Sequence, residues 1–252
     1  MPLPGPINLQ AESLGGWCSI PSSLTAEIIG RAGFDWVCID TQHGPIGLGD
    51  LVPMLQALDA AGVPALVRVA WNDRAAISHA LDSGAIGVIV PMVNSADEAA
   101  TAAAACRYAP AGARSYGPTR AALRDPAFQS DAANIAVLCF VQIETEEAIA
   151  HLDDIASTPG VDGLFVGPAD LALSLGTPAG SLVDERFRAA TREVVRAARA
   201  HARAPGVFCA TMEAAETARE DGFTMLAIQS DVRLLKSAAA EALSKLRAHQ
   251  GT

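Results

Sequence analysis

The fold of this chain is decided by Val141-Gln142-Ile143-Glu144-Thr145 and by Gly163-Leu164-Phe165-Val166-Gly167-Pro168-Ala169-Asp170. Each stretch is an apolar run typical of a buried strand, and each ends on a carboxylate where a helical pattern begins. Glu144 and Asp170 are 26 positions apart (170 − 144), about the length of one strand–helix–strand unit. In a parallel sheet this spacing puts the two strand ends side by side, about 5 Å apart. Two carboxylates at such an edge can share one hard divalent cation.

The same alternation continues along the 252 residues. Strands are predicted at 15–20, 34–40, 65–69, 86–91, 136–143, 163–167, 205–209 and 224–229, and helices at 24–32, 48–61, 73–82, 95–107, 145–156, 184–203, 211–221 and 231–248. The strands are almost continuously apolar, as expected when helices cover both faces of a sheet. We therefore predict an α/β fold with a single domain over residues 1–252, a (β/α)₈ TIM barrel. A doubly wound open sheet is the alternative, but the sequence has no G-x-G-x-x-G motif and no P-loop.

Composition narrows the partners and the compartment. Half of the residues are apolar and the formal charge is −10, which disfavours binding to nucleic acid or to an anionic membrane. The five cysteines are odd in number and lack CxxC spacing, so we expect reduced thiols. The first residues have neither the basic region nor the apolar region of a signal peptide. We expect a cytoplasmic protein without a membrane span.

One long insertion, residues 107–135, separates the fourth predicted helix from the fifth strand. It carries Arg107, Arg114, Arg120 and Arg124. A loop of this length inside a barrel is usually functional or part of an interface. The arginines fit either a solvated loop or a subunit contact.

Polar side chains interrupt the apolar strands mainly near the ends, which in a TIM barrel form the catalytic face. They are Asp40 with the nearby His43, Arg68, Gln142, Glu144 and Asp170. Arg68 would be costly to bury unpaired, so we expect it to pair with an acid such as Glu144, to bind an anionic substrate, or both. Asp40 and His43 could form a proton relay, although a histidine in a loop is more often structural. Asp170 could instead be a helix N-cap; Glu144 precedes the cap at Thr145, so capping does not explain it.

The lysines restrict the chemistry. The chain has only Lys236 and Lys245, both in the last predicted helix. A lysine that forms a Schiff base normally projects from a strand end into the site. Carbanion chemistry in this chain would therefore need a metal.

These motifs resemble the HpcH/HpaI family of class II, pyruvate-dependent aldolases, from about Trp17 to Asp231. The resemblance rests on the two central motifs, on Phe34-Asp35-Trp36 through His43, on Val67-Arg68-Val69, on Val90-Pro91-Met92-Val93 and on Arg107-Tyr108-Ala109-Pro110-Ala111-Gly112. It implies reversible aldol cleavage of 4-hydroxy-2-oxo acids to pyruvate or hydroxypyruvate and an aldehyde, through a metal-stabilised enolate. The implied metal is Mg²⁺ or Mn²⁺, with Co²⁺ as a further option.

The resemblance also implies roles for single residues. Glu144 and Asp170 correspond to the metal ligands, Arg68 to the residue that holds the keto or enolate oxygen, and His43 with Asp40 to the acid–base pair. Gln142, Gly167, Pro168, Ala169 and Phe208 are expected to line the substrate site, with the backbone N–H groups of Ala169 and Asp170 anchoring the substrate carboxylate. Asp82 resembles an acid that family members contribute from a neighbouring subunit. A homo-oligomer is implied, typically a hexamer, in which we expect the C-terminal helix to pack against a neighbour.

The chain departs from the family pattern at Gln42, at Phe208-Cys209 and at Gln229-Ser230. We assign Gln42, Phe208 and Cys209 to the acceptor side, which leaves the aldehyde open. Two rival functions are a CoA-ester lyase of the citramalyl or malyl type and a non-catalytic barrel that binds 2-oxo acids. The acidic chain disfavours a basic CoA groove, although the arginines of the insertion keep that reading open. A binder would not need an Asp40–His43 relay.

Overall fold

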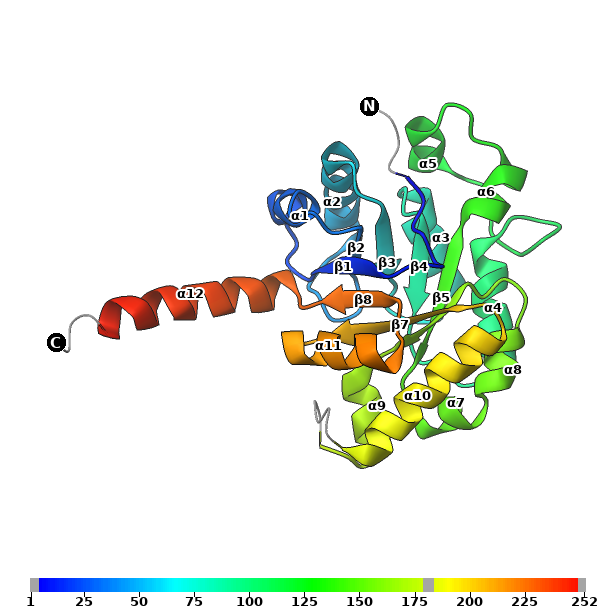
Figure 1. Ribbon diagram of the computed structural model, residues 1–252. Helices are drawn as coiled ribbons and strands as arrows, with labels where there is room; N and C mark the ends of the chain where they lie inside the picture. Colours follow the sequence, from blue (N-terminus) through cyan, green and yellow to red (C-terminus); the bar gives the residue numbers. More distant parts are fainter. Residues whose placement is uncertain (1–4, 179–183, 249–252) are drawn as a thin grey trace.

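The computed structural model describes residues 5–178 and 184–248. Eight parallel strands close into a barrel in chain order, with β8 pairing back to β1, and helices surround it (Figure 1). The strands are β1 (Ser13–Cys18), β2 (Trp36–Asp40), β3 (Ala65–Arg68), β4 (Gly87–Val90), β5 (Leu138–Ile143), β6 (Gly163–Val166), β7 (Ala204–Cys209) and β8 (Met225–Ile228). The predicted TIM barrel is confirmed, and each strand lies within two residues of its predicted bounds.

The helices are α1 (Ser23–Gly30), α2 (Leu48–Ala61), α3 (Arg74–Asp82), α4 (Ala96–Cys106), α5 (Thr119–Arg124), α6 (Ser130–Ala136), α7 (Glu146–Ala150), α8 (Leu152–Ser157), α9 (Pro168–Ser174), α10 (Glu185–Ala200), α11 (Met212–Asp221) and α12 (Asp231–Ala248). Their starts follow local chemistry, because the side chains of Ser22, Asp73 and Thr145 each accept a bond from the first helical turn. The helix predicted at 145–156 is broken at His151, whose backbone is not helical.

Alternation along the strands divides the apolar residues into two layers. One layer fills the barrel and includes Trp17, Trp36, Phe140 and Phe165. The other lies between the barrel and the helices and includes Cys209. Cys209 was predicted to face the acceptor, but it is buried in the outer layer because it follows the inward-facing Phe208 by one position. The interpretation of Cys209 as an acceptor-side residue is therefore wrong.

The insertion at 107–135 contains α5 and α6 and is tied to the barrel by its own arginines. Arg114 pairs with Asp82 at 2.5 Å, Arg120 and Arg124 both pair with Asp59 on α2, and Arg107 pairs with Asp162 at 3.4 Å. All four arginines thus hold the insertion within one chain. They do not form the free basic groove that a CoA-binding reading would require.

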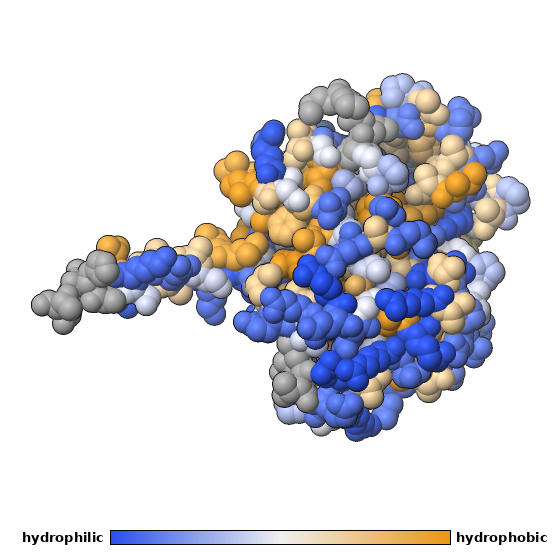
Figure 2. Space-filling view, in the orientation of Figure 1, coloured by the Kyte–Doolittle hydropathy of each residue, from blue (hydrophilic) through white to orange (hydrophobic). Residues whose placement is uncertain are grey.

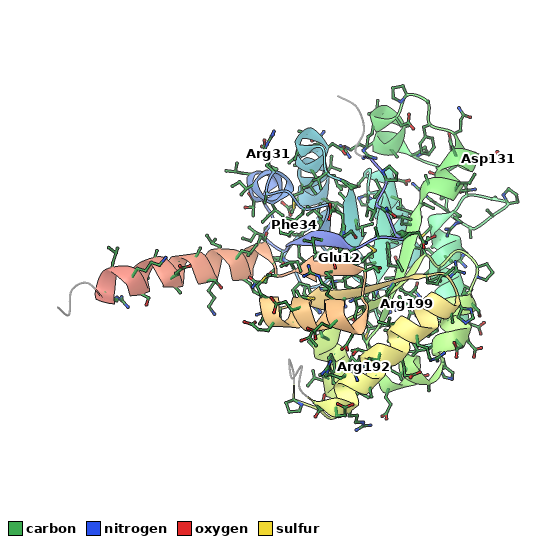
Figure 3. All side chains as sticks on the ribbon, in the orientation of Figure 1. Glu12, Arg31, Phe34, Asp131, Arg192 and Arg199 are labelled. Atoms are coloured by element: carbon green, nitrogen blue, oxygen red, sulfur yellow. The ribbon has the colours of Figure 1, made fainter. Side chains whose placement is uncertain are left out.

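The last helix leaves the barrel. α12 contacts β1 near its start and then extends away from the other helices (Figure 1). Its large exposed apolar side chains are Val232, Leu234, Leu235, Leu243 and Leu246, and Figure 2 shows hydrophobic residues along this helix and around its root. Elsewhere the helices present charge outward, as at Arg192 and Arg199 of α10 (Figure 3). Within the described ranges, no helix combines the length and apolarity needed to span a membrane.

Candidate active site

Asp40 and Arg68 form a buried ion pair at the carboxyl ends of β2 and β3. The two residues are direct neighbours in the sheet register. Arg68 donates from Nε to Asp40 Oδ1 at 2.9 Å and from Nη2 to Oδ2 at 2.6 Å, so the contact is bidentate. The side chain of Arg68 is 11% exposed and that of Asp40 is 3% exposed. The sequence predicts an acidic partner for Arg68, with Glu144 as the example. The partner in the structure is Asp40 on the adjacent strand.

The Asp40 carboxylate accepts hydrogen bonds from four residues. Besides Arg68, it accepts from the indole Nε1 of Trp17 at 3.3 Å and from the backbone N–H groups of Gln42 and His43 at 3.1 and 3.2 Å. Burial alone would raise the pKa of Asp40, but Arg68, with smaller contributions from His43 and Trp17, outweighs it and holds the pKa below its ordinary value. Asp40 therefore orients Arg68, and its hydrogen bond with His43 comes from the His43 backbone N–H and not from the imidazole ring.

Glu144 follows the end of β5 and is 1% exposed. Its Oε2 accepts from the backbone N–H of Met92 at 2.9 Å, while its buried Oε1 has no hydrogen-bond partner among the described residues. Met92 has φ of 55°, a left-handed conformation that is strained for a residue other than glycine. Burial raises the pKa of Glu144 from 4.5 to about 7, and the nearby charge of Asp170 adds to the rise.

Asp170 stands in the first turn of α9, next to Glu144. Gly167 is the N-cap of this helix and Pro168 its first residue, so Asp170 is the third helical residue and its reading as an N-cap is wrong. Gly167 leaves room for Glu144, because a Cβ atom at this position would overlap Glu144 Oε1. The junction between β6 and α9 thus brings the two carboxylates together.

The donor set at this junction fits a hard divalent cation. Glu144 offers a buried oxygen without a partner, and a second carboxylate lies close enough to raise its pKa. In the described part of the chain there is no cluster of three or more His, Cys, Asp or Glu side chains that could hold a metal. Two carboxylates suit Mg²⁺, which keeps several ligand positions for water and substrate.

Three further side chains, those of Gln142, Phe208 and Trp17, lie on the inner side of the barrel. Gln142 is 1% exposed and its Oε1 also lacks a partner among the described residues. Phe208 is half-buried and meets Trp17 edge-on with ring centroids 5.3 Å apart. Trp17 and Met92 have no role in the sequence-based site. A tryptophan inside an apolar strand resembles any core residue, and a backbone N–H leaves no signal in a sequence.

The comparisons with known proteins agree with this geometry. The family model described as HpcH/HpaI aldolase/citrate lyase matches residues 14–238.

The chain belongs to the HpcH/HpaI family.

This aldolase is 39% identical over 237 residues to the hydroxypyruvate/pyruvate aldolase of Rhizorhabdus wittichii, covering 94% of each chain. It is 39% identical over 235 residues to the 4-hydroxy-2-oxo-heptane-1,7-dioate aldolase of Salmonella arizonae, covering 92% of this chain and 88% of the relative. A crystal structure of an HpcH/HpaI aldolase/citrate lyase family protein from Burkholderia cenocepacia superposes with a TM-score of 0.88 at 34% identity, covering 94% and 95% of the two chains. The chain is thus a carbon–carbon lyase of the aldolase type.

A more distant likeness concerns the fold alone. The citrate lyase β subunit of Mycobacterium tuberculosis, complexed with oxaloacetate and magnesium, has a TM-score of 0.61 at 17% identity. A magnesium complex thus occurs on this type of barrel.

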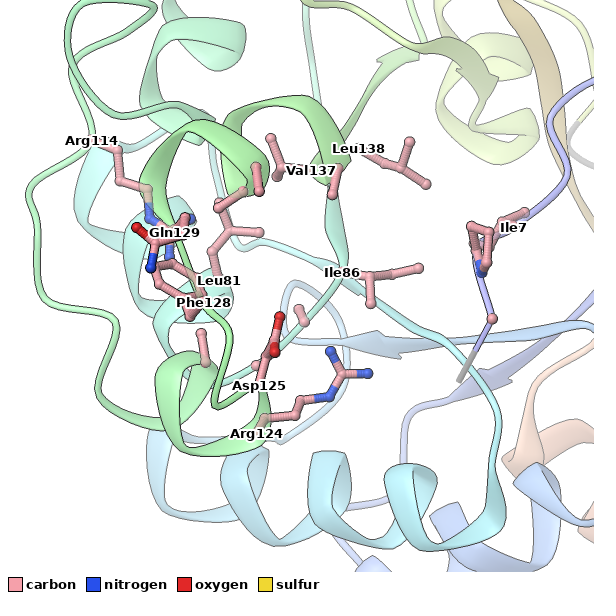
Figure 4. A pocket seen from close by; sticks show the side chains of 18 residues that line it. Ile7, Leu81, Ile86, Arg114, Arg124, Asp125, Phe128, Gln129, Val137 and Leu138 are labelled. Carbon is pink, nitrogen blue, oxygen red and sulfur yellow. The ribbon is translucent and has the colours of Figure 1, made fainter. Parts of the chain in front are cut away.

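Asp82 lies far from the catalytic end of its own aldolase barrel. It is the last residue of α3, which runs back toward the amino-terminal ends of the strands, and it pairs with Arg114. A cavity of about 350 Å³ opens at this same end, between the insertion, the starts of β4 and β5, and Ile7 (Figure 4). Asp82 therefore does not join the site of its own chain, and its contribution to a neighbouring subunit stays a prediction.

Proposed function

We propose that this aldolase catalyses the reversible cleavage of 4-hydroxy-2-oxo acids to pyruvate or hydroxypyruvate and an aldehyde, with a divalent cation as cofactor. The observation that carries the proposal is that two groups occur at the same end of the barrel. One is a buried carboxylate oxygen of Glu144 that has no hydrogen-bond partner among the described residues, and the other is the guanidinium of Arg68, which Asp40 holds in place. The names of the 39%-identical relatives support the donor class.

Arg68 supplies fixed positive charge for the keto oxygen. Two of its nitrogens are committed to Asp40, which leaves Nη1 for a substrate oxygen. Charge that develops on this oxygen when a C3 proton leaves is stabilised by a donor that needs no reorientation. The guanidinium stays in place because the carboxylate that binds it, that of Asp40, is itself held by Trp17 and by two backbone N–H groups.

His43 is the candidate for moving the proton. The residue is exposed and its backbone N–H donates to Asp40, so the loop after β2 is held while the side chain remains accessible. A histidine imidazole can accept and return a proton, which is what an acid–base group at this position must do. In the cleavage direction it would take the proton of the 4-hydroxyl group.

Glu144 and Asp170 would hold the cation, Mg²⁺ or Mn²⁺, with Co²⁺ as a further option. When bound, the cation acts as a Lewis acid toward the 2-oxo acid. The N–H groups at the start of α9, those of Ala169 and Asp170, would receive the substrate carboxylate beside the backbone of Gly167 and Pro168. Gln142 and Phe208 would line the substrate space from the barrel interior.

The deciding experiment is deuterium exchange at C3 of pyruvate and of hydroxypyruvate, measured with and without a chelator. Exchange that stops on chelation and returns with Mg²⁺ or Mn²⁺ is the expected result. Glu144→Ala and Asp170→Ala should abolish both exchange and aldol turnover while the barrel stays folded. Full activity in a metal-stripped sample would sink the proposal, as would tight 2-oxo acid binding without any exchange.

We further infer a homo-oligomer, with the hexamer as the expected state. The exposed leucines on α12 support a neighbour as the surface that covers this helix. Sedimentation of the purified chain measures the state directly.

A further inference from the structure

Trp17 touches both members of the Asp40–Arg68 pair. It lies on β1 and is 3% exposed. Its Nε1–H donates to Asp40 Oδ2 at 3.3 Å, and the guanidinium carbon of Arg68 lies 5.0 Å from its ring centroid. One side chain thus orients the carboxylate through a hydrogen bond and faces the guanidinium with its π surface.

The indole is itself braced by two aromatic rings. Phe208 on β7 meets it at 5.3 Å with planes at 67°, and Phe165 on β6 lies at 6.0 Å with planes at 30°. A packed sequence of contacts therefore runs across the barrel from β6 and β7 through Trp17 to the ion pair on β2 and β3. Aromatic pairs of this geometry are stabilising and restrict ring motion.

We propose that Trp17 is a positioning residue that holds the Asp40–Arg68 pair in the orientation needed for catalysis. Asp40 Oδ2 receives both Arg68 Nη2 and Trp17 Nε1, so the indole limits rotation of the carboxylate that sets the plane of the guanidinium. The kinetic part of this inference rests on the proposed function, because the rate depends on where Arg68 meets the substrate oxygen.

Trp17→Phe keeps an aromatic face under Arg68 and removes only the indole N–H and one ring. Trp36→Phe is a matched control, because Trp36 is also buried in the barrel and its Nε1 donates to Ser13 Oγ at 3.2 Å, a bond of the same kind in another part of the barrel. Both variants lose one buried indole hydrogen bond and similar volume. Thermal unfolding of both variants shows whether the stability losses are matched.

The expected result is a fall of about 10- to 100-fold in kcat for C3 exchange in Trp17→Phe, the size of a lost hydrogen bond to a charged group. KM should change little, and Trp36→Phe should keep the wild-type rate. In an Arg68→Lys background, Trp17→Phe should add almost no further loss, because the two residues act as a unit. Full additivity in this cycle, or a wild-type rate in Trp17→Phe, overturns the proposal.

A crystal structure of each variant gives a second readout that does not depend on activity. Arg68 should lose its bidentate contact with Asp40 or adopt a second rotamer in Trp17→Phe and stay in place in Trp36→Phe. An unmoved Arg68 in Trp17→Phe overturns the inference. If the wild-type chain shows no exchange, the proposed function fails, and the position of Arg68 in these structures alone decides the role of Trp17.

Discussion

Arg68 and Asp40 are buried together, and each would be costly to bury alone. The pair differs from an ordinary structural ion pair because Asp40 is also held by Trp17 and by two backbone N–H groups. Glu144 is the opposite case, a buried carboxylate with one oxygen left without a partner. The site therefore combines one ion pair held by several hydrogen bonds with one acid that has an oxygen without a partner among the described residues, and substitutions at the two positions should have different consequences.

At Arg68, replacement by lysine should reduce kcat for C3 exchange by about 10²-fold or more. Lysine keeps the charge but cannot reproduce the two parallel bonds to Asp40. Arg192→Lys is the control, because Arg192 pairs with Asp221 on the outer surface at 2.9 Å and is 46% exposed. Steady-state kinetics of the two variants decide the matter, and near-normal turnover in Arg68→Lys would make Arg68 structural.

At Glu144, the raised pKa predicts a pH-dependent stability in metal-free protein. The folded state holds the proton up to pH of about 7 and the unfolded chain releases it near 4.5. The stability contributed by this proton is complete below about 4.5 and is lost as pH rises through about 7, by up to ~3 kcal/mol. Metal-free wild type should therefore lose stability relative to Glu144→Gln between pH 5 and pH 8.

Urea unfolding of both proteins at several pH values measures this difference. At pH 8, Mg²⁺ should stabilise wild type and leave Glu144→Gln unchanged. Parallel pH curves for the two proteins would contradict the raised pKa of Glu144.

At the scale of elements, the turn from β6 into α9 sets the distance between the two carboxylates. Gly167 follows the last residue of β6, Pro168 begins the helix with a preset φ, and Asp170 is the third residue of the first helical turn. The space that a side chain at position 167 would take is occupied by Glu144, the residue after β5. The side chain of Glu144 therefore packs directly against the backbone of Gly167, and the turn has no space for a methyl group.

Gly167→Ala should therefore abolish exchange activity and weaken Mg²⁺ binding, because the new Cβ must displace Glu144. Gly49→Ala is the matched control, since a Cβ at this position of α2 meets no atom within 4 Å. The control should keep full activity and a nearly unchanged stability, because Gly49 is the second residue of α2 and its added methyl group meets no atom. Calorimetric titration with Mg²⁺ and the exchange assay test both variants, and an active Gly167→Ala enzyme would show that Glu144 can move freely.

The barrel could be predicted because the strands are almost continuously apolar and each gap between consecutive strands contains a helical pattern. The helices α5 and α6 could not, because neither has a buried residue and so neither shows an apolar period. In the site, the strand ends identified Asp40, Arg68 and Glu144, but not their partners. Which acid pairs with Arg68 depends on the register of β2 against β3, and the bond from Met92 depends on a backbone conformation.

At the scale of the whole molecule, α12 is the element that the barrel does not cover. Leu235 and Leu246 are 64% and 67% exposed on it. An 18-residue helix with such side chains is unlike the α10 helix, whose apolar side chains are buried against the barrel. A second copy of the chain is the partner that the proposed oligomer provides.

Replacing both Leu235 and Leu243 by glutamine should shift the protein to smaller species in sedimentation velocity. The physical reason is the loss of two apolar contacts per copy, each contributing about 1.5–3 kcal/mol when fully buried. Glutamines at Lys236 and Lys245 of the same helix provide the control and should leave the mass unchanged. An unchanged mass in the leucine variant would exclude α12 as the contact.

The position of the lysines has a practical consequence. Lys236 and Lys245 both lie on α12, and the rest of the sequence has no side-chain amine. Among side chains, an amine-acylating reagent such as an activated ester would therefore modify this helix alone. If a second copy covers α12, slow acylation of these two lysines would report that contact.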